Sequence, residues 1–452
     1  MQAFAEPTTG GSGAPRAPRV PGVRDVLVST FRRLMRLYFR QVERVGEPPG
    51  PGTRGRVIVS NHTNALIDPI LVLTDAACEI SPVAKSTLWS IPGLRWLLDR
   101  AGAVPIVRRQ DTPDKDGTAN TDVFEKVAEH LARGGNILIF PEGTSHSEPR
   151  LAPFRTGAAR MLLAAEARGG VSPTFQAAAL EFDARTDFRS RTLVLWGPVR
   201  RLADVPGTGE ERIRAATAQM AADLGELLVE GDSHEERLRV ARVAELLANE
   251  EPDRTLERWN GIGRQVELAS RTLRDTAPEL IAQVAARVDA YYAELDRLGL
   301  TDEQVAPGGL RVEAPGAAPV PEAPLSPLWR RAALAPLAAS GFVLYALPYF
   351  LPRWLARKAD PDAVSTFKLG AALIVYPLWM GGLVAGALVL LPPPVSWAAA
   401  AVAITSPFAA LRWLDAWYQR PGRATAQELA QLARLRLAAR SAIDAARTRL
   451  PS

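Results

Sequence analysis

Ser60-Asn-His-Thr-Asn-Ala-Leu-Ile-Asp-Pro69 directly follows the β-branched run Val57-Ile58-Val59. Such a run is typical of a strand, so we expect His62 where a strand ends. His62 and Asp68 lie six positions apart, on different faces of a helix, and meet only if the backbone bends between them. If they meet, the carboxylate holds one imidazole nitrogen and leaves the other free to accept a proton. The alternative is a loop histidine and a helix-capping aspartate.

The length and composition limit the class of protein. The 452 residues suggest two or three domains of roughly 150 residues each. A single cysteine, Cys78, excludes an intramolecular disulfide and fits a reducing compartment. The net charge of +5 suits acidic headgroups or phosphorylated substrates. The chain has no zinc-finger pattern, RNP motif or basic-aromatic stripe, so we expect no nucleic-acid partner.

The N-terminal part divides into two segments. Residues 1–22 are rich in Pro, Gly, Ala and Thr, which predicts disorder. They lack the basic region followed by an apolar core that is typical of a signal peptide, so we expect none. Residues 23–45 place leucines and aromatic residues opposite arginines. This pattern predicts an amphipathic helix at the membrane interface, or alternatively a helix that packs on the next domain.

Residues 46–205 alternate short apolar runs with helical patterns. This alternation predicts an α/β domain around a largely parallel central sheet. The predicted strands are 56–60, 103–108, 136–140, 175–182 and 192–196, and the predicted helices are 66–77, 86–99, 119–133 and 156–168.

The chain beyond the α/β domain is helical, then apolar. Residues 206–300 have a charged helical pattern, with helices predicted at 209–230, 233–249 and 264–298, and residues 301–328 read as a Pro/Gly/Ala linker. Residues 329–414 hold three apolar segments, followed by a helical tail at 415–452 that we expect on the cytoplasmic side. Proline interrupts the first segment, 332–352, which we expect to be interfacial or re-entrant. The segments 369–391 and 395–411 predict a transmembrane hairpin, with basic flanks facing the cytoplasm.

Two further groups of polar residues follow predicted strands. Phe140-Pro-Glu-Gly-Thr-Ser-His146 follows Asn136–Phe140; in it, Glu142 offers a hydrogen-bond acceptor, Gly143 a close backbone approach and Thr144 a hydroxyl. Arg108 and Arg109 end another strand, and Arg155 precedes a helix. Arginine forks suit phosphate oxygens, although a single arginine is more often a solvated surface charge.

Four motifs, taken in order, resemble those of the glycerolipid acyltransferase superfamily, the glycerol-3-phosphate and lysophosphatidic acid acyltransferases. The chain departs from the family in its five-residue His–Asp spacer, in Ser145-His146 and in the proline-free stretch 176–180. The spacer is similar to that of the fungal-type acyltransferases, which act on glycerol-3-phosphate or dihydroxyacetone phosphate, and of their bacterial relatives. The four motifs are Asn61-His62 through Asp68, Gly102 through Arg108, Phe140-Pro-Glu-Gly-Thr144 and Pro153-Phe-Arg155-Thr-Gly157.

The resemblance implies an O-acyltransferase that moves a fatty acyl group from a thioester to a phosphorylated glycerol. In this reading His62 is the general base and Asp68 orients it. Acyl-CoA or acyl carrier protein is the donor, and neither a cofactor nor a metal is required. The substrate-binding residues implied are Asn61, Arg108, Glu142, Gly143, Thr144 and Arg155.

Two alternatives remain open from the sequence. The chain could be an inactive membrane-anchored scaffold that keeps a lipid-phosphate pocket, or an enzyme that acts on dihydroxyacetone phosphate or another lysophospholipid. We expect contact with membrane lipids, a location in a bacterial-type inner membrane and a catalytic domain facing the cytoplasm.

Overall fold

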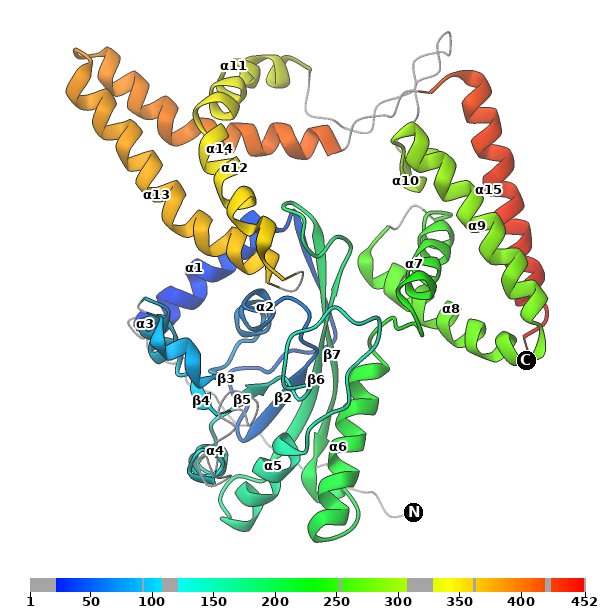
Figure 1. Ribbon diagram of the computed structural model, residues 1–452. Coiled ribbons are helices and arrows are strands. Elements are labelled where there is room, and N and C mark those ends of the chain that lie inside the picture. Colours follow the sequence, from blue (N-terminus) through cyan, green and yellow to red (C-terminus); the bar gives the residue numbers. More distant parts are fainter. Residues whose placement is uncertain are drawn as a thin grey trace, which may run out of the picture.

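The structure, a computed structural model, describes residues 22–91, 93–107, 121–251, 254–306, 328–360, 363–418 and 424–450. Its centre is a seven-stranded sheet in the order β1-β7-β6-β2-β5-β3-β4 (Figure 1). Neighbouring strands run parallel except β6 and β7, which confirms the predicted α/β fold with a largely parallel sheet. The strands are β1 (Gln41–Val45), β2 (Arg56–Ser60), β3 (Ser81–Lys85), β4 (Val104–Ile106), β5 (Ile137–Ile139), β6 (Thr174–Phe182) and β7 (Arg191–Arg201).

Helices cover both faces of the sheet, which explains why its central strands are apolar on both sides. Successive residues of β2 point to opposite faces. Val57 and Val59 join one core, and Ile58 joins a second core on the other face. The first core contains α4 (Thr121–Ala132), α5 (Gly157–Ala167) and α6 (Gly209–Gly225), and the second α1 (Val23–Tyr38) and α2 (Ile67–Asp75).

The prediction of one helix over residues 23–45 is wrong at the C-terminal end. Helix α1 ends at Tyr38, and Gln41-Val-Glu-Arg-Val45 forms β1, which pairs in parallel with β7. The two valines of this segment, Val42 and Val45, are three positions apart, a spacing that continues the helical pattern. No glycine or proline separates it from α1, so the sequence gives no boundary. Met35 and Tyr38 of α1 are buried, and α1 packs on the α/β domain.

Strand β3 was not among the strands predicted from the sequence either. It contains Pro82, and proline within a run argues against a central strand. The helix predicted over 86–99 is divided into η1 (Ser86–Ser90) and α3 (Leu94–Ala101), with Gly93 at a φ of +66° between them.

A helical region follows the sheet, as predicted. It comprises α7 (His234–Ala248), α8 (Leu256–Thr276), α9 (Pro278–Leu298) and the short α10 (Asp302–Val305). The helix predicted over 264–298 is two helices, because Pro278 begins α9. The C-terminal α15 (Ala426–Arg447) shares a core with α7 and α9. Residues 1–21 and 307–327, from the predicted disordered N-terminus and linker, lie outside the described residues.

A buried carboxylate joins α15 to this region. Asp302 accepts hydrogen bonds from the Tyr291 hydroxyl at 2.6 Å, Asn249 Nδ2 at 2.9 Å and Arg436 Nε at 2.9 Å. Its side chain is fully buried, and Arg436 also pairs with Glu250 at 2.5 Å. The predicted tail helix therefore closes the core of the helical region.

The apolar C-terminal region contains α11 (Leu328–Leu344), α12 (Ala346–Leu355), α13 (Val364–Leu390) and α14 (Val395–Tyr418). Within the described part of the chain, α13 and residues 395–415 of α14 are long and apolar enough to cross a membrane. Leu334–Leu344 and Ala346–Lys358 meet at a bend of 44° and would add a third span if they act as one. Two apolar helices thus lie where the hairpin was predicted.

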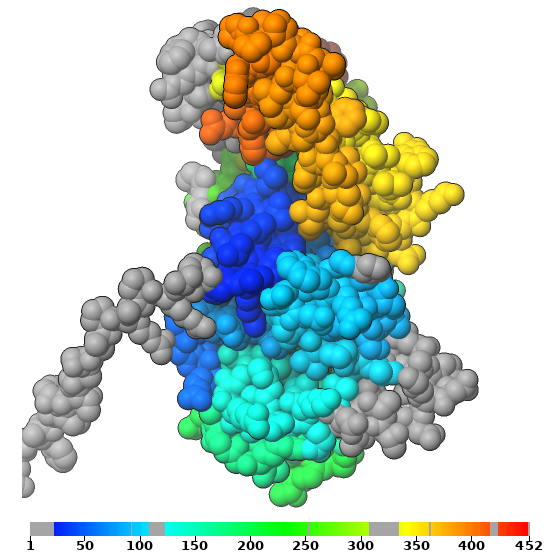
Figure 2. Space-filling model, turned by 90° about the vertical axis from the view of Figure 1, so that its left-hand side faces the viewer, coloured from blue at the N-terminus to red at the C-terminus, as the bar shows by residue number. Residues whose placement is uncertain are grey.

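Both ends of the α13–α14 hairpin meet the α/β domain. Ser365 and Lys368, near the start of α13, donate to backbone carbonyls of Arg185 and Thr186 at 2.9 and 2.6 Å. Near the end of α14, Asp415 accepts from Arg189 Nε at 2.7 Å. The turn between the two helices is therefore the part of the hairpin farthest from the sheet (Figure 1). Figure 2 shows α12 and α13 (yellow to orange) above α1 (dark blue) and the α3 segment (light blue).

Candidate active site

Two segments of the site follow neighbouring parallel strands. β2 ends at Ser60 and β5 ends at Ile139, and the two strands pair directly. The chain after each strand therefore leaves the sheet at the same edge, where open α/β sheets place ligands. The two segments are joined, because the His146 backbone N–H donates to the carbonyl of His62 at 3.0 Å.

His62 and Asp68 face each other. His62 Nδ1 lies 3.0 Å from Asp68 Oδ2, which also accepts the backbone N–H groups of Thr63 at 2.8 Å and Asn64 at 2.7 Å. Ala65, at a φ of +30°, supplies the bend before α2 that the spacing required. Because an ionised carboxylate only accepts, Nδ1 carries the proton and Nε2 keeps its lone pair. The structure thus shows a paired histidine rather than an isolated loop residue.

Glu142 lies beneath this pair and contacts the protein with both oxygens. Its Oε1 accepts the His62 backbone N–H at 2.9 Å, and its Oε2 accepts the Ala152 N–H at 2.8 Å. Oε2 also pairs with His146 Nε2, and the Glu142 side chain is fully buried. Glu142 therefore holds the backbone of His62, and it is not among the residues that line the cavity described below.

His146 has a structural use that sequence reasoning missed. Hydrogen bonding to Glu142 raises the pKa of His146 above its ordinary value, because the carboxylate stabilises the imidazolium, while burial opposes the shift. His146 Nδ1 accepts the Glu148 N–H at 3.2 Å, which leaves Nε2 to donate to Glu142 when the ring is neutral. The only signal for this role is the position of His146, four residues after Glu142.

Asn61 ties the end of β2 to β6. Its Nδ2 donates to the Leu180 carbonyl at 2.9 Å, and its Oδ1 accepts the Leu180 N–H at 2.8 Å. The residue is 3% exposed, so its amide is used within the sheet and does not reach the cavity. The proline-free stretch 176–180 keeps the backbone N–H groups of β6 available for such pairing.

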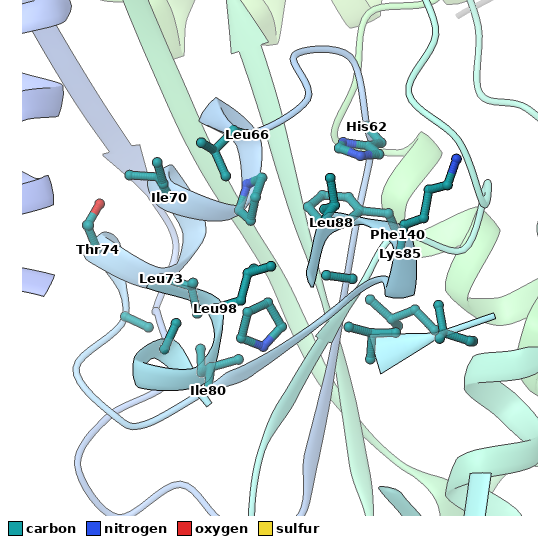
Figure 3. Close-up of a pocket in the computed structure, with 18 of the residues that line it drawn as sticks. His62, Leu66, Ile70, Leu73, Thr74, Ile80, Lys85, Leu88, Leu98 and Phe140 are labelled. Carbon is teal, nitrogen blue, oxygen red and sulfur yellow. The ribbon is translucent and has the colours of Figure 1, made fainter. Parts of the chain in front are cut away.

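A cavity of about 1330 Å³ opens beside His62 (Figure 3). The imidazole stacks on the ring of Phe140, with the centroids 4.1 Å apart and the planes 20° from parallel. Pockets for one small ligand measure about 300–1,000 Å³, so this cavity has room for more than one substrate. Its apolar wall runs along α2 and is completed by residues of α1 and α3: Leu66, Ile70, Leu73, Leu27, Phe31 and Leu98.

Cationic side chains also line the cavity, and two of them, Arg24 and Arg32, come from α1. Gly143 has a φ of +81°, and a Cβ there would lie 2.6 Å from Arg155 Nε, so glycine lets the guanidinium lie over the turn. Arg155 is exposed, and no carboxylate among the described residues pairs with it. Lys85, at the end of β3, also lines the cavity beside His62 and Phe140 (Figure 3). Sequence reasoning missed Lys85 because it missed β3.

Thr144 does not line the cavity. Thr144 is exposed, and its hydroxyl donates to the Ser145 carbonyl at 3.3 Å. Arg108 and Arg109 lie outside the described residues. Within the described ranges, no group of three or more His, Cys, Asp or Glu side chains could hold a metal ion.

An oriented imidazole at the edge of an α/β sheet, open to a cavity lined by both apolar and cationic side chains, has the geometry that general-base chemistry requires. Residues 38–175, which include β2, β5 and both halves of the site, match the family model described as Acyltransferase. The match is confined to these residues, and over them the chain is similar to the acyltransferase family.

Relatives of known name match short stretches of the chain. A chloroplast 1-acyl-sn-glycerol-3-phosphate acyltransferase of Brassica napus is 30% identical over 102 residues, 23% of this chain and 27% of that protein. Glycerol-3-phosphate O-acyltransferase 2 of Saccharomyces cerevisiae is 40% identical over 82 residues, 17% of this chain and 11% of that protein. The matches thus span about a quarter or less of these relatives.

Among solved structures, the 1-acyl-sn-glycerophosphate acyltransferase of Thermotoga maritima aligns with 44% of this chain and 78% of its own, at 14% identity and a TM-score of 0.31.

Proposed function

We propose that this chain is a membrane-bound O-acyltransferase of phospholipid biosynthesis. It transfers a fatty acyl group from a thioester to a hydroxyl of glycerol-3-phosphate or lysophosphatidate. The observation that carries the proposal is one cavity that places the oriented His62 beside both the apolar wall along α2 and the cationic side chains of Lys85 and Arg155. An acyl chain fits the apolar wall and a phosphate the cationic side chains, so the reacting groups meet at the imidazole.

His62 acts as the general base. Its Nε2 removes the proton of the acceptor hydroxyl while the hydroxyl oxygen attacks the thioester carbonyl carbon. The C–S bond then breaks, and the imidazolium returns the proton to the leaving thiolate. Asp68 holds the tautomer and offsets the positive charge on the ring. A positioned base typically contributes about 10²–10⁴-fold to the rate. The reaction needs neither a resident cofactor nor a serine or cysteine nucleophile.

The apolar wall along α2 holds the acyl chain. Leu66, Ile70 and Leu73 recur at helical spacing and face the cavity with residues of α1 and α3. Each buried methylene contributes about 0.8 kcal/mol, so the length of chain that this wall covers sets donor preference. The donor is acyl-CoA or acyl carrier protein, whose polar carrier remains outside the cavity.

Arg155 binds the acceptor phosphate. Its guanidinium lies over Gly143 at the strand end that also carries Phe140, and charge-assisted hydrogen bonds from arginine suit phosphate oxygens. The family resemblance adds Arg108 to this role, and Thr144 and Gly143 to positioning of the glycerol. In this proposal Asn61 and Glu142 support the site through the backbone contacts described above.

The membrane hairpin places this chemistry beside its substrates. Both ends of the hairpin meet the α/β domain, so the cavity lies close to the bilayer that dissolves the acyl chains of donor and product. Basic residues flank the hairpin on the domain side, which supports a cytoplasmic orientation in a bacterial-type inner membrane.

A labelled-acyl assay tests the proposal. Full-length protein in phospholipid nanodiscs is mixed with radiolabelled palmitoyl-CoA and, in separate reactions, glycerol-3-phosphate, lysophosphatidate and dihydroxyacetone phosphate. We expect labelled lysophosphatidate or phosphatidate from wild type and none from His62→Ala. Absence of product from wild type with every acceptor and with palmitoyl-acyl carrier protein would favour the scaffold alternative. Product from dihydroxyacetone phosphate alone would correct the acceptor.

A further inference from the structure

The first turn of α13 reaches the loop that carries the His62–Asp68 pair. Thr366 Oγ1 accepts the backbone N–H of Leu66 at 2.9 Å, across 300 positions of sequence. Thr366 also lines the same cavity as His62, Ala65 and Leu66. A residue of a helix that is long enough to cross the membrane is thus part of the wall of the candidate active site.

The hydrogen bond meets a need of the catalytic loop. The first N–H groups of a helix have no partner within the helix, and Leu66 is the residue that precedes α2. Asn64 supplies its carbonyl to the N–H groups of Ile67 and Asp68, at 2.9 and 3.4 Å, but not to Leu66. Thr366 therefore satisfies a half-buried donor two residues before Asp68.

A second contact from α13 braces the loop through another segment. Ser365 is fully buried, and its hydroxyl donates to the Arg185 carbonyl at 2.9 Å. The same carbonyl accepts Asn64 Nδ2 at 3.2 Å, and the Arg185 guanidinium donates to the Thr63 carbonyl at 3.0 Å. The loop between His62 and Asp68 is thus held directly by Thr366 and indirectly by Ser365.

The hydrophobic core adds to this docking. Leu369, one turn after Ser365, is 6% exposed and belongs to the core that contains Ile58 of β2 and Ile67 of α2. This contact fixes α13 against the same two elements that flank the catalytic loop. A helix that served only to attach the protein to a bilayer would need neither the buried serine nor the threonine in the cavity.

We infer that Thr366 and Ser365 are positioning residues, through which the seating of α13 sets the alignment of Asp68 with His62. This inference rests on the acyltransferase activity proposed above. When the Leu66 N–H loses its acceptor, the strained Ala65 bend relaxes, and Asp68 moves relative to the imidazole. The effect falls on the chemical step, because the Thr366 hydroxyl is bound to the Leu66 N–H and the Ser365 hydroxyl to the Arg185 carbonyl.

The test compares four variants of the full-length protein in nanodiscs of phosphatidylethanolamine and phosphatidylglycerol. Thr366→Val removes the acceptor at nearly constant volume, Thr366→Ser keeps it, and Ser365→Ala removes the second contact. Thr405→Val is the matched control, because the Thr405 hydroxyl bonds only within α14, to the Ala401 carbonyl at 2.7 Å. Steady-state kcat and the KM values for acyl-CoA and acceptor are measured, with thermal unfolding in parallel.

We expect Thr366→Val to lower kcat about tenfold, the factor that about 1.4 kcal/mol of lost transition-state stabilisation gives. Both KM values should change less than about twofold. Ser365→Ala should also lower kcat, and Thr366→Ser should retain at least half of the wild-type kcat. An unchanged kcat in Thr366→Val, an equal loss in Thr405→Val or a failure of serine to restore activity would overturn the inference. An inactive wild type would instead overturn the proposed function.

Discussion

Replacement of Asp68 by asparagine tests the catalytic pair with the smallest change in shape. Asp68 Oδ2 accepts three hydrogen bonds, from His62 Nδ1 and from two backbone N–H groups. Asp68 Oδ1 is buried and has no partner among the described residues. An asparagine can keep its carbonyl oxygen on the three donors only if its amide nitrogen takes the place of Oδ1, where no acceptor meets it.

The size of the effect follows from this geometry. A buried donor without an acceptor costs about 1–3 kcal/mol, so the free energy of unfolding should fall by that amount. If the amide turns instead, its nitrogen faces the N–H groups of Thr63 and Asn64, and His62 is driven to the other tautomer. In either orientation the imidazolium loses its negative partner. We therefore expect kcat to fall about 10²–10⁴-fold, with KM nearly unchanged.

The assay follows thiol release from palmitoyl-CoA in the presence of glycerol-3-phosphate. Wild type, Asp68→Asn and His62→Ala are compared in nanodiscs, and thermal unfolding shows that each variant is folded. If Asp68→Asn kept kcat within about threefold of wild type while His62→Ala was inactive, the carboxylate would not assist the base, and the reasoning would be refuted.

Three further predictions concern the cavity and the support beneath it. Arg155→Ala should raise the KM for the phosphorylated acceptor about tenfold or more with little change in kcat, because a charge-assisted hydrogen bond contributes about 1.5–3 kcal/mol. An unchanged KM would place Arg155 outside the phosphate site. Leu73→Trp should shorten the apolar wall and so favour a shorter acyl chain. The kcat/KM for dodecanoyl-CoA, divided by the kcat/KM for palmitoyl-CoA, should rise by up to about 100-fold, because the four additional methylenes of palmitoyl contribute about 3 kcal/mol. A constant ratio would place the acyl chain elsewhere. The pKa of His146 is higher in the folded protein than its value of about 6.5 in the unfolded chain. The bond between His146 and Glu142 therefore stabilises the protein fully when the pH is below the unfolded-state pKa. This stabilisation is lost as the pH rises through the folded-state pKa. His146→Gln should therefore lower Tm more at about pH 5.5 than at about pH 8.5, and equal losses at both would contradict the linkage.

The sequence predicted the parts of the site that follow strands. Runs of β-branched and apolar residues marked β2 and β5, and parallel strands bring their carboxyl ends to one edge. His62, Asp68 and the turn at Gly143 are therefore brought together as the sequence implied. The role of Glu142 could not be read in the same way, because residue type does not show whether a carboxylate faces a cavity or the backbone.

Other features carried no local signal. β1 continues the amphipathic pattern of α1 without a turn residue, and Pro82 argued against β3. Missing β3 also concealed Lys85, since a strand end is what would mark that lysine as a cavity residue. Thr366 precedes the predicted apolar segment 369–391, and its contact with Leu66 spans 300 positions. Such a contact becomes visible only when the helix is placed against the sheet.

The carboxylate of Asp302 has a consequence for biogenesis. Its buried arginine partner, Arg436, leaves the ribosome 134 residues later, after both α13 and α14. Removal of one partner from a buried ion pair costs about 3–5 kcal/mol, so the helical region cannot close stably on a chain that stops before Arg436. Synthesis therefore completes the apolar hairpin before the helical region can complete its core. A ribosome that stalls in the tail leaves a chain whose helical region is open, with its apolar core exposed.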